Sequence, residues 1–141
     1  MKTYQMLNEI RKAADMGVVG IDAVQHMASQ LPMHEALMQQ RQEYIEIMNR
    51  ADSLLQAKGG RIRSTNPIAK RLAAAGSAMK LSMEQTDSKL AEMMIEGNTK
   101  GMIRSYQNIR SLDVKDSKTV ELSRKLLDTE LHNIEQMKKF L

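Results

Sequence analysis

Hydrophobic residues recur at helical spacing from the start of the chain. Between Thr3 and Ser29 they lie three and four positions apart, which predicts one helix with a single buried face. That face would carry Leu7, Ile10, Ala14, Gly17 with Val18, Ile21, Val24 and Ala28. Pro32 ends this helix and suits the first turn of a second one, which runs to about Lys58 before Gly59-Gly60. Because the joint is so short, the two helices must be antiparallel.

The remainder predicts a second long hairpin after a crossover. Residues 59–66 read as a polar, basic loop, and Asn66-Pro67 is a start signal for a short helix. The apolar side of that helix would carry Ile68, Leu72, Ala75, Met79 and Met83. A long helix then begins near Asp87 and ends around Ser111, and a turn at 113–117 leads into the last helix. That helix places Val120, Leu127, Ile134, Met137 and Leu141 on one stripe. The predicted fold class is all-α, a bundle of four long helices with a short helix in the crossover.

The two hairpins, residues 1–58 and 87–141, also resemble each other in pattern. Gly17 aligns with Gly101, and the segment from Leu37 to Met48 aligns with that from Leu126 to Met137. The second copy places Glu130 where the first has Arg41. We therefore predict one domain, 1–141, made of two pseudo-repeated αα-hairpins joined by residues 59–86. The alternative is the general similarity of helices rich in Leu, Ile and Met.

Composition restricts the setting and the chemistry. The absence of Cys excludes disulfides and thiolate metal sites. No apolar run is long enough to span a membrane, and the charged amphipathic N-terminus is unlike a signal peptide, so we expect a cytoplasmic protein. Only two Pro, no Trp and 13 Met favour helices around an adaptable aliphatic core.

The net charge of +4 is concentrated in the crossover. No acidic residue lies between Lys58 and Lys80, where the basic residues are Lys58, Arg61, Arg63, Lys70, Arg71 and Lys80. Such a patch could bind nucleic acid, an anionic membrane surface or an acidic protein, and its alternative is an ordinary solvated surface. Nucleic acid is the less favoured partner, because aromatic residues are not interleaved with the basic ones.

Two segments, LAEMMIEGNTKGMIRSYQNI (Leu90–Ile109) and SRKLLDTELHNIEQMKKFL (Ser123–Leu141), resemble small bacterial ferritin-like and spore-coat-like proteins. The layout of the whole chain is similar to the ferritin-like superfamily, which includes rubrerythrins and bacterioferritins. Iron-binding members of that superfamily take one Glu from each of two helices and a Glu-x-x-His pair from each of the other two. The resemblance therefore implies a possible di-iron centre inside the bundle.

The ligand pattern of that superfamily is largely missing from this chain. Its Glu-x-x-His frames fall on Arg41 with Tyr44 and on Glu130 with Asn133, and its single Glu positions fall near Ala14-Asp15 and Asn98-Thr99. A guanidinium among the ligands would repel a metal cation. We therefore expect neither a metal nor another cofactor. Of the histidines, His26 and His34 flank one turn, where Glu35 could join them, and His132 lies one position off the inward register.

In place of a metal we predict a polar cluster in the core. Arg41 would form an inward ion pair with Glu130, and Tyr44 and Asn133 would satisfy the remaining donors and acceptors. The alternative is that Arg41 and Glu130 both point outward and never meet.

These observations predict a protein that is not an enzyme but a structural or protein-interaction module, with a homodimer expected by resemblance. No nucleophile motif is present. One alternative is a residual di-metal or oxidoreductase protein using Asp15, Glu96, Glu130 and Glu135. Another is anion or nucleic-acid binding through residues 58–80. Gly17, Gly20, Gly97 and Gly101 would allow close helix packing or, alternatively, line a pocket.

Overall fold

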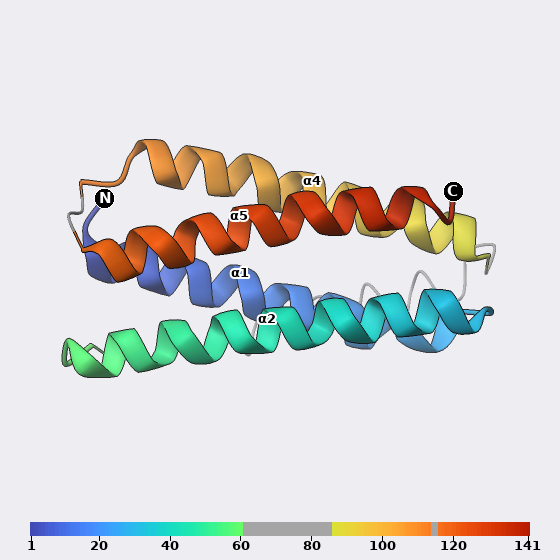
Figure 1. Cartoon of the computed structure of the whole chain (residues 1–141), viewed down its shortest axis with the longest axis horizontal. Coiled ribbons are helices and arrows are strands. Elements are labelled where there is room, and N and C mark those ends of the chain that lie inside the picture. Colours follow the sequence, from blue (N-terminus) through green and yellow to red (C-terminus); the bar gives the residue numbers. More distant parts are fainter. Residues whose placement is uncertain (61–85, 114–115) are drawn as a thin grey trace.

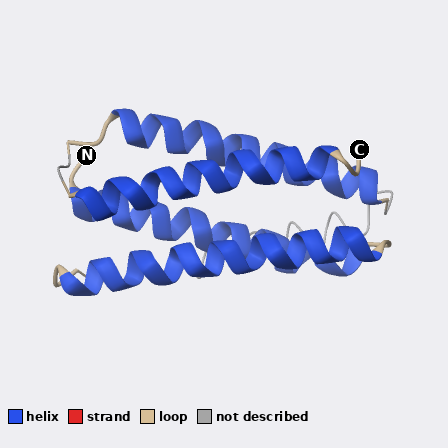
Figure 2. Ribbon diagram, viewed as in Figure 1, coloured by secondary structure: helices blue, strands red, loops and turns tan. Residues whose placement is uncertain are grey.

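The computed structural model describes residues 1–60, 86–113 and 116–141, and this part of the chain contains helices and no strand (Figures 1 and 2). The elements are α1 (Thr3–Val24), the 3-10 turn η1 (Gln25–Met27), α2 (Leu31–Ala57), α4 (Asp87–Arg110) and α5 (Ser117–Lys138). The predicted all-α class and the four long helices are confirmed. The short helix predicted within the crossover lies outside the described residues.

The helix ends follow the local signals in the sequence. Pro32 lies in the first turn of α2, and Gly59 follows the helix with φ at +72°, a left-handed conformation that glycine adopts without strain. At the start of α4 the Thr86 hydroxyl accepts a hydrogen bond from the Lys89 backbone N–H at 3.1 Å. The prediction of one α-helix to Ser29 was too long, because the chain tightens into η1 after Val24.

The two hairpins are joined by a long crossover. The Asp87 carboxylate accepts hydrogen bonds from the backbone N–H groups of Ser29 and Gln30, at 2.8 and 3.1 Å, which places the start of α4 beside the α1–α2 turn. At the opposite end, the Asp113 N–H donates to the Met1 carbonyl at 3.0 Å. The connection after α2 therefore begins at one end of the bundle and reaches α4 at the other, so α2 and α4 run in the same direction (Figure 1).

The core confirms the predicted face of α1 and corrects that of α5. In α1 the stripe through Leu7, Ile10, Ala14 and Ile21 is buried. In α5 the predicted stripe is right only in part, since Leu127 and Met137 are buried, Val120 and Ile134 are half-buried and Leu141 is exposed. The buried residues of α5 are Thr119, Leu122, Ser123, Leu126, Leu127, Thr129, Glu130, Asn133 and Met137. Five of these nine residues are polar, so a search for apolar spacing finds only part of the buried face.

The four helices do not pack evenly around the core. α1 packs along α2, and α4 packs along α5, whereas α1 and α4 make little contact with each other. Among the described helices, the space between α1 and α4 is therefore the least closely packed. Across the described residues, none of the helices has an apolar stretch of the length that a bilayer crossing requires.

Candidate functional site: a cleft between α1 and α4

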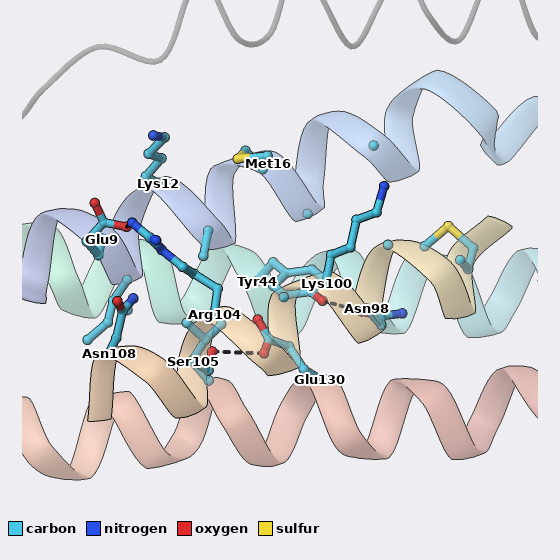
Figure 3. Close-up of a pocket in the computed structure, with 18 of the residues that line it drawn as sticks. Glu9, Lys12, Met16, Tyr44, Asn98, Lys100, Arg104, Ser105, Asn108 and Glu130 are labelled. Atoms are coloured by element: carbon cyan, nitrogen blue, oxygen red, sulfur yellow. Dashed lines mark hydrogen bonds and ion pairs between the residues drawn. The ribbon is translucent and has the colours of Figure 1, made fainter. Parts of the chain in front are cut away.

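A cavity of about 590 Å³ lies between α1 and α4 (Figure 3). Its walls are mainly the apolar and small residues of these two helices, and its inner end is formed by Tyr44 of α2 and Glu130 of α5. Binding sites for small molecules typically occupy about 300–1,000 Å³ and combine apolar walls with a few polar groups. The cleft has both properties.

Four glycines determine the shape of this cleft. A Cβ atom at Gly17 would come within 2.6 Å of the Tyr44 ring, and one at Gly101 within 2.8 Å of Glu130 Oε1. At Gly20 and Gly97, by contrast, a Cβ atom would meet no atom of the described residues within 4 Å. The prediction that these glycines allow close helix packing is therefore wrong for the pair α1 and α4. The alternative is confirmed, because all four glycines line the cavity.

A hydrogen-bonded polar cluster lies beside the cavity, inside the bundle. The Tyr44 hydroxyl donates to Asn98 Oδ1 at 2.8 Å, and Asn133 Nδ2 lies 3.5 Å from the same hydroxyl. All three side chains are buried. Burial raises the pKa of Tyr44 above its usual range, and the nearby Glu130 acts in the same direction, so the hydroxyl keeps its proton and remains a donor. The cluster thus joins α2, α4 and α5 at the positions where the ferritin-like resemblance would place metal ligands.

Among the described residues, Glu130 is the one carboxyl that extends into the inner end of the cavity. Glu130 is only 3% exposed. Its Oε2 accepts a hydrogen bond from the Ser105 hydroxyl at 2.9 Å, and its Oε1 lies against Gly101 (Figure 3). Within the described residues, no Lys, Arg or His lies within ion-pair distance of this carboxyl. Burial raises the pKa of Glu130 to about 7, and the Ser105 hydrogen bond opposes this rise.

The rim of the cleft is charged and exposed. Arg104 of α4 reaches across to Glu9 of α1, with a 3.5 Å contact between Nη2 and Oε2, and so bridges the opening (Figure 3). Lys12 and Lys100 also line the rim and are exposed. Ion pairs of this kind contribute little, about 0–1 kcal/mol, so the bridge is easily opened.

The predicted ion pair between Arg41 and Glu130 is wrong. Arg41 instead pairs with Asp22 of α1, at 2.7 Å from Nε to Oδ1 and 3.2 Å from Nη2 to Oδ2, and both side chains are partly exposed. The buried face of α2 runs through Leu37, Gln40 and Tyr44, which leaves Arg41 at its flank. There a guanidinium can stay hydrated and still form two hydrogen bonds.

The other predicted metal ligands do not converge. Glu96 and Glu135 are exposed, as are His26, His34 and His132. Asp15 of α1 is half-buried and is not among the residues that line the cavity. In the three described segments, no three side chains of His, Asp or Glu lie close enough together to share a metal ion.

The basic patch is described only at its first residue. Lys58 forms an ion pair with Asp116 at 3.3 Å, and this contact is one reason why the pKa of Asp116 is lowered, after the hydrogen bond from Thr119. Arg61, Arg63, Lys70, Arg71 and Lys80 lie outside the described residues.

Comparison with known proteins adds no relative to this picture. No family model, no curated protein and no solved structure matches the chain.

The sequence predicted Glu130, Tyr44 and Asn133 in the core but not three further buried polar residues. Ser105 and Asn108 of α4 line the cavity, and Gln40 of α2 is fully buried and donates to Gln136 at 2.9 Å. One signal was available for α4. Asn98, Gly101, Ser105 and Asn108 recur three and four positions apart, so a helical stripe of small and polar residues was present.

Proposed function

We propose that this chain is a non-catalytic binding module on a ferritin-like bundle, and that it holds an apolar ligand in the cleft between α1 and α4. The observation that carries the proposal is the space at Gly20 and Gly97, which no described residue fills. Glycine in the middle of a helix costs about 1 kcal/mol relative to alanine, so two glycines that contact none of the described neighbours do not help this part of the fold. They do keep the cleft wide enough for another molecule.

The polar cluster supports the ferritin-like part of the proposal. Tyr44, Asn98 and Asn133 meet inside the bundle, at positions derived from the ligand frame of that superfamily. Amide and phenol groups there can hold one another by hydrogen bonds, whereas a hard or borderline metal prefers carboxylate and imidazole ligands. The substitution therefore favours binding or structural work over metal chemistry.

The geometry also favours binding over catalysis. Ser105 donates to Glu130, which superficially resembles a nucleophile with its base, but Ser105 is buried in the middle of α4. Its neighbouring backbone N–H groups are used within the helix, so they cannot form an oxyanion hole. A hydroxyl beside one carboxyl, without such donors, lacks the groups that acyl transfer needs.

Fluorescence titration with the neutral apolar dye Nile red tests the proposal. We expect saturable binding to the unmodified protein, and a loss of about tenfold or more in affinity for Gly20→Leu/Gly97→Leu, in which two leucines fill the cleft. Glu96→Leu is the matched control, because it adds a leucine to an exposed position of α4 next to Gly97 but outside the cavity. Equal binding by the filled variant and the control, or no binding at all, would refute the proposal.

The metal-binding alternative has its own test. Elemental analysis of protein purified without chelator, after growth with added iron and manganese, should find well below one metal ion per chain. A stoichiometric amount would restore the di-metal hypothesis.

A further inference from the structure

The chemistry at the inner end of the cleft identifies a class of ligand. This step rests on the proposed function, since it assumes that the cleft admits a small molecule. We propose that the cleft binds an apolar primary amine, with the ammonium group paired to the carboxylate of Glu130 and the hydrocarbon against the walls of α1 and α4.

The first argument is the unbalanced charge of Glu130. Carboxylates are almost never fully buried unless they are paired, because removal of a charge from water is costly. Glu130 is buried, yet within the described residues it has a single hydrogen-bond partner, the Ser105 hydroxyl. Its Oε1 atom faces the cavity and has no hydrogen-bond partner among the described residues (Figure 3). A cation that enters the cleft would supply the missing charge.

The second argument is the way in which the protein holds this carboxyl in place. Gly101 allows Oε1 to lie against α4, and a Cβ atom there would come within 2.8 Å of it. Ser105, one helical turn later, fixes Oε2. Two residues on the same face of α4 therefore orient the carboxyl and leave one oxygen available. Such preorganised polar groups give orientation and specificity in binding sites with apolar walls.

The third argument is the nature of the walls. Ile10 and Met16 of α1, Met93 and Met94 of α4, and Leu126 of α5 line the cavity. Methionine side chains are flexible and polarisable, so they adapt to a hydrocarbon of variable shape. The volume of about 590 Å³ suits an alkyl chain or a small ring system that carries one polar head.

An amine fits these features better than the other amphipathic classes. The carboxylate of a fatty acid could approach Lys12 and Lys100 at the rim, but its hydrocarbon end would then lie against Glu130 and leave that charge unpaired. The rim cations are exposed and screened by salt, so they attract or repel ligands only weakly. An alcohol could donate one hydrogen bond to Glu130 but would not balance its charge. A hydrogen bond between charged groups is about twice as strong as a neutral one.

The test compares three probes of equal chain length on the full chain: octylamine, octanol and octanoate. Binding is measured by displacement of Nile red at pH 8, where Glu130 is mostly ionised, and by the shifts of the Gly101 and Ser105 backbone amides in NMR spectra. Of the described residues, the titratable groups that line the cavity besides Glu130 are Glu9, Lys12, Tyr44, Lys100 and Arg104. We expect octylamine to bind about tenfold or more tightly than octanol, and octanoate to bind most weakly.

Glu130→Gln is the decisive variant, because it removes the charge but keeps the shape and a partner for Ser105. In this variant the affinity for octylamine should exceed that for octanol by about twofold or less, while octanol still binds. Glu135→Gln makes the same change at an exposed position of α5 and should leave the ratio of the two affinities unchanged.

Each other outcome overturns a defined part of the account. If octanol and octylamine bind the unmodified protein equally, or if the amine keeps its advantage in Glu130→Gln, the amine inference fails and the proposed function stands. If no probe and no dye binds, as expected where a second copy or another part of the chain fills the cleft, both fail.

Discussion

The carboxyl of Glu130 on α5 lies directly against the backbone of α4 at Gly101. A Cβ atom at position 101 would come within 2.8 Å of Oε1 and 3.1 Å of the carboxyl carbon. The glycine therefore sets the distance at which a buried carboxyl can face the cleft, and this pairing of a small residue with an acidic one has consequences that can be measured.

Substitution of Gly101 should behave differently from substitution of Gly97 on the same helix. Alanine in place of a mid-helix glycine normally stabilises by about 1 kcal/mol. Gly97→Ala should show this gain, since a Cβ atom there meets none of the described residues within 4 Å. Gly101→Ala should show little or none of it, because the new methyl group must displace Glu130. Urea denaturation of both variants measures the difference, and equal gains would mean that Glu130 does not contact Gly101.

A second pair of glycines tests the packing of Tyr44. Gly17→Ala should destabilise by about 1–3 kcal/mol, because its Cβ atom would lie within 2.6 Å of a buried aromatic ring that cannot move freely. Gly20→Ala, on the same helix but in open space, should stabilise by up to about 1 kcal/mol. Thermal unfolding of the two variants shows whether each substitution raises or lowers the stability of the fold. A stabilised Gly17→Ala would show that the Tyr44 ring does not pack on α1.

The buried acid predicts a specific dependence of stability on pH. Burial raises the pKa of Glu130 from 4.5 in the unfolded chain to about 7 in the folded one. Between these values the folded protein binds more protons than the unfolded chain. The protonated Glu130 therefore stabilises the fold fully below pH 4.5, and this contribution is lost as the pH rises to 7. The loss amounts to about 3 kcal/mol.

Comparison with Glu130→Gln isolates this contribution from all other titrating groups. The variant and the unmodified protein should have similar free energies of unfolding near pH 4, and the variant should be the more stable at pH 8. Denaturant titrations across this range provide the measurement. If the difference between the two proteins does not change with pH, Glu130 is not the buried acid described here.

The partner of Arg41 is tested by a double-mutant cycle. Because Arg41 pairs with Asp22 near the surface, Arg41→Met should cost less than about 1 kcal/mol. Its effect should add to that of Glu130→Gln without coupling, since the two residues share no contact. A coupling energy of about 2 kcal/mol or more would indicate that Arg41 lies in the core beside Glu130.

The parts of this fold that could be predicted are those whose structure depends on local chemistry. Pro32, Gly59 and Thr86 set helix ends through backbone geometry and capping, so these ends could be placed from the sequence. The buried face of α5 could be placed only in part, because Thr119, Ser123, Glu130 and Asn133 share it with the predicted Leu127 and Met137. Periodicity locates a buried face only when that face is apolar.

The candidate site was predictable only in part, for a related reason. Glu130, Tyr44 and Asn133 were placed inside by the ligand frame, but nothing in the sequence shows that Asp22 of α1 lies beside Arg41. The same holds for the glycines. Whether Gly97 and Gly101 bring two helices together or line a space between them depends on the distance between α1 and α4, and that distance is a property of the whole bundle.

The most direct test is a crystal structure of the protein with octylamine bound. The account predicts electron density for one alkyl chain in the cleft between α1 and α4, with the nitrogen at hydrogen-bond distance from Glu130 Oε1. A cleft filled by protein side chains, or a ligand whose nitrogen lies at the rim away from Glu130, would contradict it.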